Sequence, residues 1–208
     1  VQKTALGTHR YLAFHRAVLQ SVQHIESVQH IESAQTGVPS RRWLLKTPGY
    51  VFMLDDLLTA YPDASVILTH RDPAKTMPST VSTTAMVQWM RTDHVDLEAL
   101  SPLLAAVFTD ALTTVGRRRA DGSLPGIYGD VRFTDLMADP VDAIERAYTD
   151  IGLELSSEHR RAITAYLADK PRGKHGTHRY STDAWGFDAE VLRADLSEYL
   201  TANRVELE

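Results

Sequence analysis

"SVILTHRDPAKTMPS", residues 65–79, decides the fold because it joins an apolar strand to a helix within one short stretch. The run 65–69 is continuously apolar rather than alternating, which predicts a strand that is covered on both faces. Asp72 and Pro73 are typical of an N-cap followed by the first residue of a helix. The stretch therefore predicts a buried strand that ends near Arg71 and leads directly into a helix.

This strand-to-helix corner has the features of a site for a phosphate. Ligands of open parallel sheets bind beyond the carboxyl ends of the strands, where Arg71 is expected. The helix points its free amides and the positive end of its dipole at the same place. Ser79 follows Pro78, which should bend the helix. An arginine and a hydroxyl that converge suit a phosphate monoester. The alternative is that Arg71 pairs with Asp72 or a loop, and that Ser79 is an ordinary helix serine.

Apolar residues at helical or strand spacing predict the other elements. We expect helices over residues 10–33, 50–60, 73–90, 97–119, 140–151, 158–168 and 189–202, and strands over 42–45, 65–69 and 126–133. The order strand, helix, strand between residues 42 and 69 is that of a βαβ unit, which implies a parallel sheet. The whole chain, residues 1–208, is predicted to be a single α/β domain.

Composition narrows the classes of function. The chain has 208 residues, 43% hydrophobic and 24% charged, as is typical of a globular protein. Its net charge of −5 creates no overall field for nucleic acid or an anionic membrane, so an anion site has to be built locally. The absence of cysteine excludes disulfides and thiolate metal sites and fits a reducing, cytoplasmic location. No apolar stretch approaches the roughly 18 residues of a membrane helix.

Further cations accompany the corner. Lys46 follows the first predicted strand and either faces the same crevice or is solvated. Arg172, Gly173 and Lys174 belong to a polar loop, residues 170–188, which either covers an anion or is a solvated basic loop. No G-x-x-x-x-G-K-[ST] motif is present, so the chain has no glycine-rich loop that would cradle a diphosphate. No metal site is predicted.

The residues resemble a known family. "WLLKTPGYVFMLDDLLTAYPDASVILTHRDPAKTMPS", residues 43–79, resembles the core of bacterial sulfotransferases, which have a P-loop-like fold and use 3′-phosphoadenosine 5′-phosphosulfate (PAPS). The resemblance implies a three-layer α/β fold with a short parallel sheet. It also implies that Arg71 and Ser79 bind the 3′-phosphate of the cofactor.

The resemblance extends to the later loop and to two further residues. "ADKPRGKHGTHRYSTDAWGFD", residues 168–188, is similar to the C-terminal loop of the family, which implies that Arg172, Gly173 and Lys174 cover the cofactor. It further implies that Lys46 lies near the transferred group and Tyr50 near the acceptor.

The sequence departs from the family pattern at two points. Family members begin with a strand and a loop that binds the 5′-phosphosulfate; the chain begins at Val1 without them, so we expect a fragment or a processed chain. Relatives often carry histidine where this chain has Tyr50, and a tyrosine with a pKa near 10 is a poor base at neutral pH. The base is then His70, His15, a carboxylate, or absent.

The implied function is transfer of a sulfuryl group from PAPS to a hydroxyl or an amine of a small acceptor, without a metal. The alternatives are a nucleotide-binding pseudoenzyme that holds the 3′-phosphate without catalysis, a kinase with Asp72 as a magnesium ligand, and a structural domain. We expect no nucleic acid or membrane partner. The segments 86–96 and 180–187 are expected to set acceptor specificity, but neither the acceptor nor the oligomeric state follows from the sequence.

Overall fold

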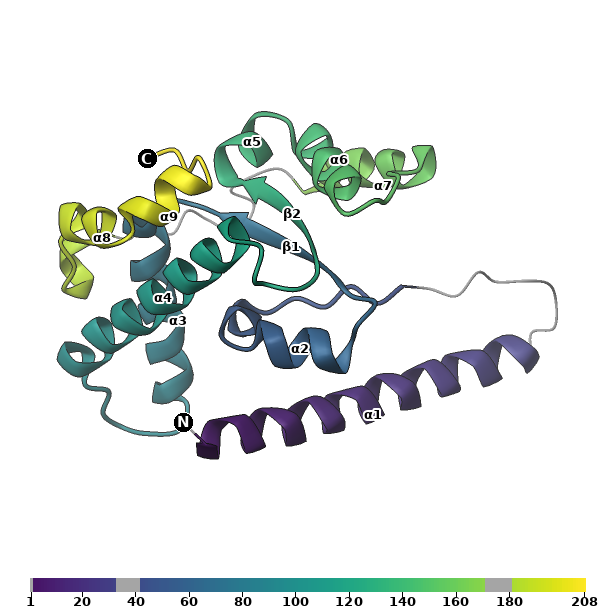
Figure 1. Cartoon of the computed structure of the whole chain (residues 1–208), viewed down its shortest axis with the longest axis horizontal. Coiled ribbons are helices and arrows are strands. Elements are labelled where there is room, and N and C mark those ends of the chain that lie inside the picture. Colours follow the sequence, from purple (N-terminus) through teal and green to yellow (C-terminus); the bar gives the residue numbers. More distant parts are fainter. Residues whose placement is uncertain (1, 33–41, 171–180) are drawn as a thin grey trace. The chain divides into compact units, whose positions relative to one another are not determined.

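The computed structural model describes residues 2–32, 42–170 and 181–208, and of the side chains before residue 42 only those of 7–25. The chain forms two compact units, Val1–Ala64 and Ser65–Glu208, and each is described by itself (Figure 1). The prediction of an α/β chain with a short parallel sheet is confirmed.

The first unit consists of helices. It contains α1 (Gln2–Glu32), the 3₁₀ helix η1 (Pro48–Phe52) and α2 (Leu54–Ala60). Leu12 of α1 is 2% exposed, and the imidazole Nδ1 of His15 lies 2.7 Å from the hydroxyl oxygen of Tyr61, which follows α2. The predicted strand over residues 42–45 is wrong. The described part of this unit holds no strand to pair with it, and Leu44 is 87% exposed.

The second unit contains the sheet. β1 (Ser65–His70) and β2 (Ile127–Arg132) pair in parallel, and α3 (Pro73–Trp89) and α4 (Leu97–Ala120) connect them. The parallel partner of β1 is therefore β2, and not the stretch 42–45 as predicted. The apolar residues 66–68 of β1 are only half-buried, so the expected cover on both faces is incomplete among the described residues.

In the described part of the chain after β2, six helices follow: α5 (Phe133–Ala138), α6 (Pro140–Asp150), α7 (Ser157–Asp169), η2 (Asp183–Trp185), α8 (Ala189–Asp195) and α9 (Ser197–Ala202). The side chain of Asp139 accepts hydrogen bonds from the amides of Val141 and Asp142 and caps α6, whose start agrees with the helix expected from residue 140. The predicted helix over residues 189–202 is instead interrupted at Leu196. That residue is 1% exposed, and the break buries it together with Tyr199 against α4.

Close packing covers the side of the sheet that faces α6. In Figure 1 the helices α5–α7 lie on one side of the sheet and the pair α3–α4 on the other. α6 lies so near β2 that a Cβ atom on Gly129 would stand 2.6 Å from the carbonyl oxygen of Ala147. The main apolar cluster joins α3, α4 and α8 through Met77, Val81, Ala85, Val95, Leu100, Phe187 and Leu192.

α4 differs from the expectation that no segment of the chain resembles a membrane helix. It is long and apolar enough to cross a membrane by length and composition alone, because its leucines, alanines and valines raise the mean hydropathy without forming an unbroken apolar run. One such helix is weak evidence for a membrane span, since a helix of a folded domain passes the same test. Here α4 contacts α3 and α9, and its last turn carries three arginines.

Candidate anion-binding site at the ends of the parallel strands

The corner predicted to bind phosphate lies where the two strands end side by side. The register pairs His70 with Arg132, so Arg71 and Phe133 are the residues that directly follow the two strands. The guanidinium carbon of Arg71 lies 3.7 Å from the centre of the Phe133 ring. A cation over an aromatic face is attracted by the ring quadrupole, which fixes the plane of the guanidinium. Phe133 was missed by the sequence analysis, which placed it in a strand.

Arg71 already binds an anion in this structure. Its Nε donates to Oε1 of Glu208 at 2.7 Å and its terminal NH2 group donates to Oε2 at 2.9 Å. This is the two-point geometry in which arginine recognises carboxylate and phosphate oxygens. The alternative expected from the sequence was a pair with Asp72 or a loop; Arg71 pairs with Glu208, which lies 137 positions away in the coil after α9.

Asp72 anchors the start of α3 and is fully buried. Its side chain accepts from the amide of Ala74 at 2.9 Å, which confirms the predicted N-cap. It also accepts from the guanidinium of Arg193 at 2.7 Å and from the amide of Glu208 at 2.9 Å. Burial alone would raise the pKa of Asp72, but these hydrogen bonds outweigh it and lower the pKa. With both oxygens occupied by protein donors, Asp72 is a structural residue in this corner rather than a magnesium ligand.

Ser79 lies half-buried on α3, after the buried Pro78. Both hydrogen bonds described above for the guanidinium of Arg71 go to Glu208. The convergence of Arg71 and Ser79 on one phosphate therefore stays a prediction.

A buried polar network lies directly beneath the corner. His70 is 2% exposed, and its Nδ1 lies 2.6 Å from the hydroxyl oxygen of Tyr199 and its Nε2 2.8 Å from Oδ1 of Asp130. Arg119, at the end of α4, donates to both oxygens of Asp130 at 2.7 and 2.9 Å. Both ring nitrogens of His70 are thus engaged, so this residue holds β1, β2 and α9 together rather than serving as a base.

The network shifts the protonation of its members. Burial would raise the pKa of Asp130, but the hydrogen bonds from His70 and Arg119 hold it well below its usual range. Burial, together with the Asp130 carboxylate, raises the pKa of Tyr199 to about 12. The network therefore favours an ionised Asp130 and a neutral Tyr199 at physiological pH.

The other predicted site residues are in different parts of the chain. Lys46 and Tyr50 belong to the first unit, where Lys46 is exposed and Tyr50 is half-buried in η1. Burial and the nearby phenols of Tyr11 and Tyr61 raise the pKa of Tyr50, which makes it a still poorer base. Arg172, Gly173 and Lys174 lie outside the described residues, as do the histidines of the same loop.

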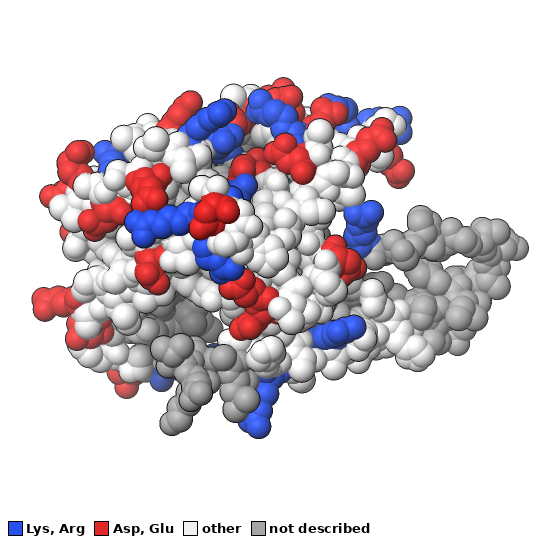
Figure 2. Space-filling model, viewed as in Figure 1, with Lys and Arg blue, Asp and Glu red and all other residues white. Residues whose placement is uncertain are grey.

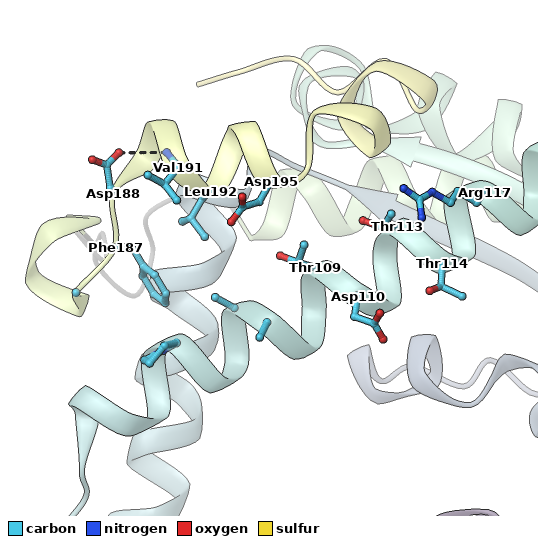
Figure 3. A pocket seen from close by; sticks show the side chains of 14 residues that line it. Thr109, Asp110, Thr113, Thr114, Arg117, Phe187, Asp188, Val191, Leu192 and Asp195 are labelled. Carbon is cyan, nitrogen blue, oxygen red and sulfur yellow. Dashed lines mark hydrogen bonds between the residues drawn. The ribbon is translucent and has the colours of Figure 1, made fainter. Parts of the chain in front are cut away.

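A surface groove lies elsewhere in the second unit, between α4 and α8 (Figure 3). Its volume is about 760 Å³, and it combines apolar residues such as Phe187 and Leu192 with Thr109, Asp110 and Asp195. Phe187 falls in one of the segments expected to set acceptor specificity, whereas neither Arg71 nor Ser79 lines the groove.

Charges are mixed on the face of the molecule that Figure 2 shows. Acidic and basic side chains are interspersed there. Within residues 2–32, 42–170 and 181–208, no group of three or more metal-ligating side chains comes together.

Comparisons with known proteins agree with the geometry. No curated protein matches the chain. Two solved structures do: sulfotransferase STF9 from Mycobacterium avium (26% identity, TM-score 0.67, 80% of this chain and 43% of that chain) and sulfotransferase STF1 from Mycobacterium tuberculosis H37Rv (28%, 0.55, 76% and 40%). The chain thus spans less than half the length of these structures. Because residues 6–157 match the sulfotransferase family, the chain belongs to that family of transferases.

Proposed function

We propose that the protein transfers a sulfuryl group from PAPS to a hydroxyl or amine of a small acceptor. The observation that carries this proposal is the bidentate grip of Arg71 on an oxyanion at the end of a parallel strand. When bound, PAPS supplies the sulfuryl group. We further propose a cytoplasmic location and no nucleic acid partner, in keeping with the negative net charge and the absence of cysteine.

The role proposed for the corner is to hold the 3′-phosphate of the nucleotide. The guanidinium of Arg71, whose carbon lies 3.7 Å from the centre of the Phe133 ring, presents two donors to two phosphate oxygens. Ser79 donates its hydroxyl to a third oxygen. Arg172, Gly173 and Lys174 are proposed to cover the nucleotide from the C-terminal loop, as in the family.

Lys46 and Tyr50 are proposed to act at the other end of the reaction. The exposed ammonium of Lys46 has the charge needed to stabilise the transferred group. The raised pKa of Tyr50 keeps its phenol neutral, so Tyr50 is proposed to orient the acceptor rather than to remove its proton.

Calorimetry with adenosine 3′,5′-bisphosphate tests the nucleotide corner. We expect Arg71→Ala to weaken binding by about 2 kcal/mol, the magnitude for a lost charged hydrogen bond, or about 30-fold in Kd. Ser79→Ala should weaken it less. Arg161→Ala, on the exposed side of α7, removes the same charge elsewhere and should leave Kd unchanged. If Arg71→Ala and Arg161→Ala weaken binding of the bisphosphate equally, the effect of Arg71 is one of net charge and the corner is not a specific site.

Transfer of labelled sulfate from PAPS separates catalysis from binding. The proposed function predicts labelled product with at least one hydroxyl or amine acceptor in a panel. Binding of the bisphosphate without transfer would instead favour the nucleotide-binding pseudoenzyme. The absence of both would leave a structural domain.

A further inference from the structure

The end of the described chain folds back onto the corner at Arg71. After α9, residues 203–208 run to the start of α3, where three contacts fix Glu208. Its amide donates to Oδ2 of Asp72 at 2.9 Å, its carbonyl oxygen accepts from Arg193 at 3.1 Å, and its carboxylate takes both donors of Arg71. We call residues 203–208 the strap.

The carboxylate of Glu208 occupies one two-donor fork of Arg71, and its negative charge repels a phosphate that approaches the same guanidinium. Nε and one terminal nitrogen of a guanidinium form one fork, and one fork accommodates one bidentate oxyanion at a time. We propose that Glu208 is a built-in competitor of the nucleotide phosphate at Arg71, so that binding requires its carboxylate to leave. This inference rests on the proposed function, since it concerns regulation of the same site.

The contacts indicate that the carboxylate can leave while the strap stays in place. The backbone of Glu208 is held separately, by the buried Asp72 and by Arg193, whose own ion pair measures 2.7 Å. The Arg71–Glu208 pair is the more exposed one, with side chains 36% and 24% accessible to solvent. Solvent therefore screens this pair, and its loss costs little compared with the loss of a buried pair.

Charge favours the phosphate in this competition. A phosphate monoester carries between one and two negative charges at neutral pH, with a second pKa near 6, whereas a carboxylate carries one. Both groups offer the two oxygens that the fork of Arg71 requires. The competitor thus lowers the affinity for nucleotide without closing the site, and it excludes weaker anions.

Calorimetry on variants of the strap tests this competition in the full chain. We expect Glu208→Gln to bind adenosine 3′,5′-bisphosphate about three- to tenfold more tightly than the wild type, in line with the modest energy of a partly exposed ion pair. Glu206→Gln makes the same change of charge at an exposed position two residues away and should leave Kd unchanged. An equal gain in both variants, or none in Glu208→Gln, would overturn the competition while leaving the proposed function intact. If neither the wild type nor Glu208→Gln binds, the proposed function fails as well.

A second measurement uses the wild-type chain alone. In ¹⁵N spectra, the side-chain Nε–H signal of Arg71 should shift on titration with the bisphosphate, because its acceptor changes from carboxylate to phosphate. The backbone amide signal of Glu208 should stay close to its original position, because Asp72 still accepts from it. A shift of neither signal at saturating nucleotide would overturn the proposal.

Discussion

At the scale of single residues, the hydrogen bonds of His70 hold the strand end that carries Arg71. It precedes Arg71 and is the last residue of β1, yet its imidazole is buried between Tyr199 and Asp130. A buried polar group that loses its hydrogen-bond partner lowers the free energy of unfolding. Removing either partner of the His70 imidazole should therefore destabilise the fold. The sequence places His70 at the end of a predicted strand, but it does not predict its partners, because they lie 60 and 129 positions away.

Tyr199→Phe tests this support. The change removes only the hydroxyl and leaves Nδ1 of the buried His70 without its partner, which we expect to lower the free energy of unfolding by about 1–3 kcal/mol. Urea denaturation followed by circular dichroism measures the effect. Tyr166→Phe, at a position 58% exposed on α7, removes the same atom and should change the free energy of unfolding by less than about 0.5 kcal/mol.

Asp130→Asn and Glu198→Gln compare two bidentate arginine pairs. Asp130 binds Arg119 and His70 in a partly buried site, whereas Glu198 binds Arg117 with both side chains more than half exposed. We expect Asp130→Asn to cost about 2 kcal/mol or more, and Glu198→Gln to change the free energy of unfolding much less because solvent screens the exposed pair. Equal changes in the denaturation midpoints would show that burial does not govern these pairs.

At the scale of elements, local signals predicted the helices well and the sheet incompletely. The N-cap Asp72 marked the start of α3, because capping depends on neighbouring residues alone. The strand expected over residues 42–45 failed because a strand exists only where a second strand supplies hydrogen bonds. The apolar residues of this stretch do not show whether a second strand lies beside it.

Gly129→Ala tests the contact between β2 and α6. A Cβ at this position would stand 2.6 Å from the backbone oxygen of Ala147, so the helix has to move away, and we expect a loss of about 1–3 kcal/mol. Gly116→Ala in α4 meets only an ordinary contact at 3.7 Å and should be neutral or stabilising, because alanine favours helix. Thermal melting of both variants measures the difference, and similar melting temperatures would contradict the close packing.

At the scale of the whole molecule, the buried carboxylates link stability to pH. The pKa values of Asp72 and Asp130 are lower in the folded chain than the value near 4 in an unfolded one. Their contribution is present above about pH 4 and is lost as the pH falls below it, because protons bind preferentially to the unfolded state. Denaturation between pH 6 and pH 2 should show this loss, and Asp130→Asn should show a smaller acid dependence than the wild type.

The alkaline side depends on Tyr199 with the opposite sign. Its pKa of about 12 lies above the value near 10 of an unfolded tyrosine, so the folded state holds the proton more tightly. This contribution is present below about pH 10 and is lost as the pH rises toward about 12. Denaturation between pH 9 and pH 12 should show a smaller fall in stability for Tyr199→Phe than for the wild type.

Only part of the site was visible in the sequence for a physical reason. Arg71 and the cap at Asp72 follow from the order of residues at one corner, whereas Phe133, Arg193 and Glu208 reach that corner through contacts between distant segments. Phe133 could have been found, because neighbouring parallel strands end at the same edge of a sheet. The Glu208 contact carries no such pattern.

The pairing of His70 with Arg132 has a consequence for assembly of the corner. Arg71 meets its aromatic ring only after the intervening α3 and α4 have brought the second strand alongside the first. A chain growing from a ribosome therefore cannot bring Arg71 and Phe133 together until residue 133 has emerged. An anion that binds Arg71 beside Phe133 binds only the state in which the two strands are paired. It therefore stabilises this long-range pairing, which depends on contacts between distant residues.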